Sequence, residues 1–183
     1  MSRGKLLEIA RRVKKVGAEV MKNLGCGFNE TVFQNALAIE FRKNGIEYLQ
    51  EVNIEIFYKG EHVGVDRPDF VITKAGDFKK PVILEMKIAD RVSDGYRMQL
   101  KSYCTSFPRN NNPVLKDFAG GLLMSFPTHD AGAGAGIKIV VVDAKFNIIL
   151  DEQEEEEERI AREKESERKK KVLEKQKEEK KKK

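Results

Sequence analysis

Two short stretches decide the expected fold: Asp-Arg-Pro-Asp-Phe-Val-Ile-Thr at residues 66–73 and Val-Ile-Leu-Glu-Met-Lys-Ile at residues 82–88. Each is rich in β-branched or aliphatic residues and has the length of a buried strand. Each also carries charge where a buried strand is normally apolar, with Asp69 in the first and Glu85 and Lys87 in the second. Because an ionised side chain in a core is costly unless it is paired or binds a metal, these three residues need an explanation.

Side chains two residues apart on a strand point to the same face of the sheet, so Glu85 and Lys87 are predicted to share a face. If the two strands are neighbours, Asp69 can approach Glu85, and two carboxylates and an ammonium group then form one polar pocket. The (Asp/Glu)-x-Lys triplet alone is weak evidence, since it recurs elsewhere in the chain. The triplet at residues 85–87 differs from the others because it lies within an apolar strand that follows, across one turn, another strand starting with Pro-Asp.

Length and charge predict one domain with an appendage: a folded domain at residues 1–150 and a charged, Glu/Lys-rich tail at residues 151–183. The tail holds 13 acidic and 13 basic residues, so the net charge of +5 belongs to the folded domain. A basic domain is compatible with a polyanionic partner. The tail is expected to be helical or disordered, and it could recruit a protein partner.

The composition also limits the class of protein. Two cysteines and two histidines match no zinc-binding spacing, and reduced thiols are the simplest interpretation of the cysteines. No apolar run reaches the roughly 18 residues of a membrane span, so no membrane partner is expected. The N-terminus leads into an amphipathic pattern and not into the apolar core of a secretory signal. The expected location is intracellular, either cytoplasmic or nuclear.

The remaining pattern alternates helices with strands. An amphipathic helix from Leu6 ends at Gly25, and Asn29 can cap a second helix that runs to Asn44. A third helix is expected at residues 93–107. The apolar face of the second helix is predicted to comprise Val32, Phe33, Ala36, Leu37, Ile39 and Phe41. Strands are expected at residues 48–52, 54–58, 63–73 with an interruption at Pro68, 82–88, 120–126, 137–142 and 146–150.

Several ordered motifs together resemble the PD-(D/E)XK nuclease superfamily, and more closely its small GxxExxY branch. Residues 27–33, Gly-Phe-Asn-Glu-Thr-Val-Phe, are similar to the motif that names the branch. They are followed by Arg-Pro-Asp at residues 67–69, Leu-Glu-Met-Lys at residues 84–87 and Gln-Leu-Lys-Ser-Tyr at residues 99–103. The resemblance extends from about Leu6 to Phe126. The final tyrosine of the branch motif is Phe33 here, which removes a hydroxyl group.

The resemblance implies an α/β fold with a restriction-endonuclease-like αβββαβ core, in which helices flank a mixed central sheet. It also implies that Asp69 and Glu85 hold a divalent metal ion, with Glu30 as a further acid at the rim of the site. Lys87 would help to position or activate the attacking water, and Gln99 would orient a ligand or phosphate. The simpler interpretation of Glu30 is that it only complements the dipole of its helix.

Chemistry is consistent with these roles, because carboxylate oxygens without Cys or His favour a hard ion such as Mg²⁺ or Mn²⁺. The first hypothesis is therefore a Mg²⁺-dependent nuclease that cleaves phosphodiester bonds in DNA or RNA, with a homodimer as one way to cut both strands of a duplex. The alternative is a catalytically silent protein of the same fold, which binds nucleic acid or serves as an assembly module. In that case the tail would be the functional part and would recruit a partner. The simplest interpretation of the charged residues themselves is a structural salt bridge between Asp69 or Glu85 and Lys87.

Overall fold

The computed structural model describes residues 3–110, 112–115, 117–129 and 136–181. The chain divides into two compact units, Met1–Asp151 and Glu152–Lys183, which are described separately. The first unit contains the stretches that dominate the sequence pattern. The second unit consists of the charged tail.

Two helices open the first unit. Helix α1 (Arg3–Leu24) buries one apolar stripe and is followed by Gly25, whose φ of 71° lies in the left-handed region that suits a helix end. Helix α2 (Glu30–Lys43) begins after Asn29, whose side-chain Oδ1 accepts a hydrogen bond of 3.1 Å from the backbone N–H of Val32. The predicted cap is confirmed, and it fixes where Glu30 enters the first turn of α2.

Within the described residues, six strands form one mixed sheet in the order β1-β4-β5-β6-β7-β8, and two further strands form a separate hairpin. The β5–β6 pair is parallel and the other pairs are antiparallel. The strand bounds are β1 (Ile46–Gln50), β2 (Ile54–Tyr58), β3 (Glu61–Asp66), β4 (Phe70–Ala75), β5 (Val82–Ile88), β6 (Gly120–Phe126), β7 (Lys138–Asp143) and β8 (Ile148–Asp151).

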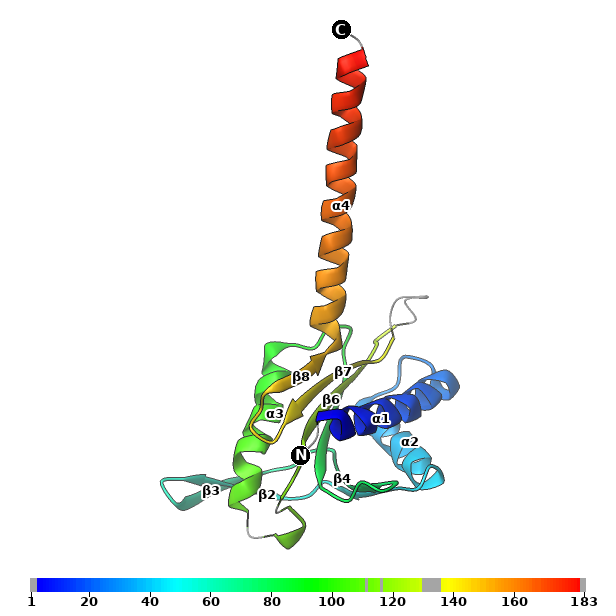
Figure 1. Cartoon of the computed structure of the whole chain (residues 1–183). Coiled ribbons are helices and arrows are strands. Elements are labelled where there is room, and N and C mark those ends of the chain that lie inside the picture. Colours follow the sequence, from blue (N-terminus) through cyan, green and yellow to red (C-terminus); the bar gives the residue numbers. More distant parts are fainter. Residues whose placement is uncertain (1–2, 111, 116, 130–135, 182–183) are drawn as a thin grey trace. The chain divides into compact units, whose positions relative to one another are not determined.

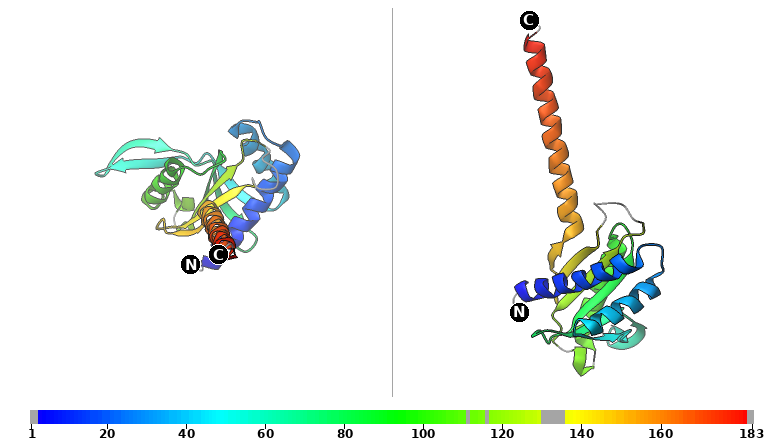
Figure 2. Two further views of the ribbon diagram at one scale, coloured as in Figure 1. Left: turned by 90° about the horizontal axis from the view of Figure 1, so that it is seen from above. Right: turned by 90° about the vertical axis from the view of Figure 1, so that its right-hand side faces the viewer.

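Helices cover both faces of the sheet. Helices α1 and α2 lie on one side, and helix α3 (Asp94–Ser106) lies on the other (Figure 1, Figure 2). Side chains that alternate along β5 divide accordingly: Leu84 and Met86 join the core under α1 and α2, whereas Ile83 joins the core under α3. The sequence α2-β1-β4-β5-α3-β6 is the αβββαβ core of a restriction-endonuclease-like fold, with the β2–β3 hairpin inserted after β1.

The first and last strands lie within two residues of the expected ranges 48–52 and 146–150. Two other predictions need correction. Residues 63–73 are not one interrupted strand, because β3 ends at Asp66 and β4 begins at Phe70, in different sheets. Pro68 lies in the break, where it does not have to donate a ladder hydrogen bond. Ile39 does not lie on the apolar face of α2, since it is 45% exposed. Its neighbours Leu37 and Ala38 fill the core at that level.

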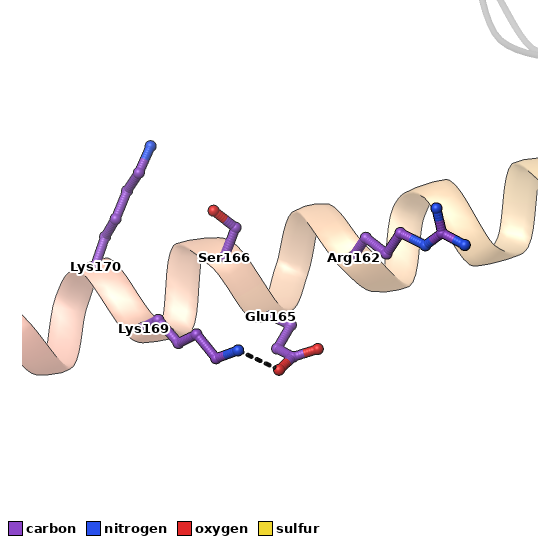
Figure 3. A pocket seen from close by; sticks show the side chains of 5 residues that line it. All are labelled: Arg162, Glu165, Ser166, Lys169 and Lys170. Carbon is purple, nitrogen blue, oxygen red and sulfur yellow. Dashed lines mark ion pairs between the residues drawn. The ribbon is translucent and has the colours of Figure 1, made fainter.

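The second unit is helix α4 (Glu152–Lys181), whose sequence is dominated by Glu, Lys and Arg. Two pairs of side chains four residues apart run in the direction that complements the helix dipole, Glu158–Arg162 at 2.9 Å and Glu165–Lys169 at 2.6 Å. The pair Arg159–Glu163 at 3.0 Å runs in the opposite direction. Figure 3 shows the Glu165–Lys169 pair together with its neighbours along α4. All the side chains drawn there come from a single helix, so the hollow between them is an ordinary groove between solvated side chains and not a binding site.

Among the helices of the described residues, none combines the length and the apolar character that a membrane crossing requires.

Gly120 at the start of β6 provides a test of the sheet. Its φ is 153°, and a Cβ atom at this position would clash with the backbone carbonyl oxygen of Val142 on β7. We expect Gly120→Ala to lower the free energy of unfolding by about 2 kcal/mol or more, because neither backbone can yield without breaking the β6–β7 ladder. Urea denaturation monitored by circular dichroism measures the change. Gly64→Ala in β3 is the matched control, since a Cβ atom there meets nothing within 4 Å. Equal losses in the two variants would contradict this account of the sheet.

Candidate metal and nuclease site

The candidate site lies where β4 and β5 stop pairing. The antiparallel pair keeps register from Ile72↔Val82 to Phe70↔Leu84. Beyond that point β5 continues to Ile88 beside β6, while the chain before Phe70 turns away through Pro68. Asp69 is therefore the last residue before β4, and it lies opposite Glu85. The neighbouring strands expected from the sequence are observed.

The parting of the strands leaves backbone N–H groups of β5 without a strand partner on the β4 side. Carboxylates take over as acceptors: the N–H of Met86 donates to Asp69 Oδ2 at 2.7 Å, and the N–H of Ile88 donates to Glu30 Oε1 at 3.4 Å. A buried backbone donor without an acceptor is costly, so the short hydrogen bond from buried Met86 holds Asp69 against the end of β5. The longer, weaker one from Ile88 brings Glu30 alongside. Glu30 thus contacts β5 directly, in addition to complementing the dipole of α2.

Glu85 and Lys87 share one face of β5, as the alternation of the strand predicts. Lys87 Nζ donates to Glu85 Oε1 at 2.8 Å. The other oxygen, Glu85 Oε2, accepts a weak hydrogen bond of 3.4 Å from the backbone N–H of Asp69. The ammonium group also lies 5.7 Å from the ring centroid of Tyr96 on α3, within the range of a cation–π contact. Two carboxylates and one ammonium group therefore converge in one polar cluster. We call this cluster of Asp69, Glu85 and Lys87 the carboxylate pocket.

Burial gives these groups unusual proton affinities. Glu85 is 2% exposed, and burial together with the nearby charge of Asp69 raises its pKa to about 7. Burial also raises the pKa of Asp69, against the lowering effect of the hydrogen bond from Met86. Burial alone would lower the pKa of Lys87, but its hydrogen bond to Glu85 and the surrounding carboxylates together raise it. Ionising the two buried acids therefore costs free energy, and a positive charge bound between them would reduce this cost.

Gln99 lies on α3, and its Nε2 donates to the hydroxyl of Tyr103 at 2.9 Å. That hydroxyl in turn donates to the carbonyl oxygen of Arg67 at 3.1 Å. Because Tyr103 is fully buried, this chain of hydrogen bonds ties α3 to the segment that delivers Asp69. The structure therefore places the Gln99 amide against Tyr103, and Tyr103 is what connects it to the backbone next to Asp69.

Sequence reasoning assigned no role to Gln34, yet its Nε2 donates to Asp69 Oδ1 at 2.5 Å. One signal could have found it: Gln34 follows Glu30 by four residues, so both side chains lie on the same face of α2. Tyr103 ends the motif at residues 99–103, but the sequence assigns no role to its hydroxyl group or to Tyr96. Their polar roles depend on what lies opposite α3, which the helical spacing does not reveal.

The donor atoms suit a hard divalent cation, because they are carboxylate oxygens with raised pKa values in a partly buried pocket. Asp69 and Glu85 form the close pair, whereas Glu30 influences the pKa of Asp69 through its charge. Across the described part of the chain, no group of three or more His, Cys, Asp and Glu side chains is clustered closely enough to hold a metal ion. The two-carboxylate pair is thus the part of the expected ligand set that the fold brings together.

The raised pKa of Glu85 predicts how stability depends on pH. The folded state keeps the Glu85 proton up to about pH 7, whereas the unfolded chain loses it near 4.5, so ionisation destabilises the fold as pH rises through this window. We expect the free energy of unfolding of Glu85→Gln, relative to that of wild type, to increase by roughly 3 kcal/mol between pH 4.5 and pH 7.5. Urea denaturation across this range measures it.

The matched control for this measurement is Glu47→Gln, which removes an exposed acid from β1. Its stability relative to wild type should change little over the same range. A flat difference between wild type and Glu85→Gln would show that Glu85 titrates normally in the folded protein.

Comparison with known proteins gives an independent result. Residues 7–133 match the family model described as the PD-(D/E)XK nuclease superfamily. No curated protein matches the chain significantly. The matched segment starts in α1 and includes every residue of the candidate pocket, from Glu30 through Asp69, Glu85 and Lys87 to Gln99. The chain therefore belongs to the PD-(D/E)XK nuclease superfamily.

Proposed function

We propose that this protein is a Mg²⁺- or Mn²⁺-dependent nuclease that hydrolyses phosphodiester bonds in DNA or RNA. One observation carries the proposal: Asp69 and Glu85 meet beside the ammonium group of Lys87 at the point where β4 and β5 part. Membership of the superfamily supports a nucleic-acid substrate, and its members generally use divalent metal ions. The assignment to the GxxExxY branch stays a prediction from the sequence motifs.

In this proposal Asp69 and Glu85 hold the metal ion, and Glu30 is a further acid at the rim of the site. A bound divalent ion would polarise a phosphoryl oxygen and favour hydroxide over water as the nucleophile. The protein itself supplies the geometry. Asp69 is fixed by the N–H of Met86 on one oxygen and by the Gln34 amide on the other, so its carboxylate has one defined orientation before any ligand arrives.

Lys87 is the cationic group of the site. It remains an ammonium group at neutral pH, because its pKa is raised by its hydrogen bond to Glu85 and by the surrounding carboxylates, although burial opposes this. An ammonium group donates hydrogen bonds and does not accept a proton, so Lys87 is suited to orient a water molecule or to stabilise negative charge on a phosphate. Gln99 is proposed to orient the phosphate or a ligand beside Tyr103.

A second candidate function rests on the same contacts. The Lys87–Glu85 pair is already satisfied at 2.8 Å, with Glu85 almost fully buried, as in a purely structural salt bridge. A protein that retained the fold but lost turnover would bind nucleic acid without cleaving it. The two candidates differ in their response to metal ions, which makes them separable by experiment.

The decisive experiment compares wild type with Asp69→Asn and Lys87→Ala on labelled DNA and RNA. We expect wild type to cleave one of these in Mg²⁺ or Mn²⁺ and to lose activity in chelator. Each variant should lower kcat/KM by about 100-fold or more, because it removes a charge from the reacting centre. Lys74→Ala is the matched control, since Lys74 is a half-exposed lysine of β4 that pairs with Glu47, outside the candidate site.

Calorimetric titration with Mg²⁺ tests metal binding without turnover. Wild type should release or absorb heat that Asp69→Ala does not. Nucleic-acid binding that survives chelator, with neither cleavage nor metal-dependent heat in wild type, would favour the silent binding protein instead.

Gln34 provides a finer test of the same site. Gln34→Leu keeps the approximate shape of the side chain but removes the donor to Asp69 Oδ1. We expect the affinity for Mg²⁺ to fall by about tenfold, because a ligand that has lost its supporting hydrogen bond is less well oriented. Calorimetry measures the change, and Asn35→Ala on the exposed side of α2 is the control. Unchanged affinity in Gln34→Leu would mean that Met86 alone orients Asp69.

A further inference from the structure

The outer surface of α1 carries a row of basic side chains. Its buried stripe includes Val13, Val16 and Val20, whereas Arg11, Lys15 and Lys22 are exposed. These three residues are separated by four and seven positions. At 100° per residue they lie within an arc of about 40° on the helix, on the side opposite the buried stripe. They form one row about 16 Å long, at 1.5 Å per residue.

Three other lysines of the first unit provide a comparison with the row. Lys43, Lys74 and Lys80 each form an ion pair with a neighbouring acid. In the part of the chain that the structure describes, no ion pair or hydrogen bond engages the side chains of the row. Two acids also lie on the exposed side of α1: Glu8, and Glu19, which accepts a hydrogen bond from Asn23.

The chain leads from this row to the candidate site. Lys22 lies in the last turn of α1, and residues 25–29 connect that turn to Glu30, whose carboxylate contacts the N–H of Ile88 at the pocket. Within this connection Phe28 is 46% exposed. Helices α1 and α2 pack against each other, and Figure 2 shows them side by side on the same side of the sheet.

We propose that Arg11, Lys15 and Lys22 bind the phosphate backbone of a nucleic acid whose path continues past Phe28 to the carboxylate pocket. This inference rests on the proposed function for its substrate class and adds the surface that holds the substrate. Unpaired cations in a row release counterions when phosphates replace them, which drives binding independently of base sequence. The row spans about five nucleotides of one strand, at 3.4 Å per nucleotide along a duplex. The flanking phenylalanine offers a face on which an unpaired base can stack.

The test uses the full chain in chelator, with a fluorescently labelled 20-nucleotide single strand and the corresponding duplex. The row variant combines Arg11→Gln, Lys15→Gln and Lys22→Gln. The control combines Lys43→Gln, Lys74→Gln and Lys80→Gln, which removes the same number of positive charges from ion-paired positions. Binding is measured by anisotropy at several salt concentrations, and urea denaturation verifies that both variants remain folded.

The row variant should bind at least about tenfold more weakly than wild type near 0.1 M salt. The slope of the logarithm of its association constant against the logarithm of salt concentration should be less steep by about 2 to 3. The control should stay within about twofold of wild type, because its lysines are already neutralised. Equal losses in both variants would indicate an effect of net charge alone and would overturn the inference. Unchanged binding in the row variant would also overturn it.

A small substrate separates this inference from the proposed function. Metal-dependent hydrolysis of bis(p-nitrophenyl) phosphate, which is too small to reach the row, should be the same in wild type and in the row variant. If wild type hydrolyses neither this ester nor nucleic acid, the proposed function fails. The row is still supported in that case, provided that the row variant alone loses binding.

Discussion

The separation of β4 from β5 is the constraint on which the candidate site depends. Pairing ends at Phe70↔Leu84, and the N–H groups of Met86 and Ile88 then need acceptors. The carboxylates of Asp69 and Glu30 supply them. The same hydrogen bonds therefore satisfy the backbone of β5 and position the two acids beside it. Because an unsatisfied buried donor is costly, the N–H of buried Met86 holds Asp69 in place, and the weaker contact with Ile88 brings Glu30 beside it.

The ionised carboxylates buried at the end of the sheet are electrostatically unfavourable. Burial raises the pKa of both Asp69 and Glu85, and the charge of Asp69 further opposes the ionisation of Glu85. Lys87 offsets part of this cost through its hydrogen bond to Glu85. Stable proteins seldom retain such a pocket without a ligand or a mechanism that uses it, and perturbed acids beside a fixed cation are typical of functional sites. That reasoning, together with the superfamily, favours metal-dependent chemistry over a purely structural salt bridge.

The two faces of the sheet contribute differently to the site. From one face, α2 provides Glu30 and Gln34, which contact the end of β5 and Asp69. From the other face, α3 contributes Tyr103, whose hydroxyl holds the backbone before Asp69. Asp69 is thus supported from both layers, although it belongs to a short connection and not to a strand. The apolar cores on the two faces fix the helices, and the helices in turn fix a loop residue that must be precisely oriented.

The sequence by itself determined the strand at residues 82–88, the cap at Asn29, the αβββαβ order and the candidates Asp69, Glu85 and Lys87. Each of these follows from local spacing, composition or motif order. Only the tertiary structure decided that Pro68 divides two sheets, that Ile39 faces solvent and that Gln34 and Tyr103 support Asp69. The physical reason is that a helical or strand period shows which side chains share a face. What lies opposite that face depends on how distant segments pack, and this information is not contained in any local pattern.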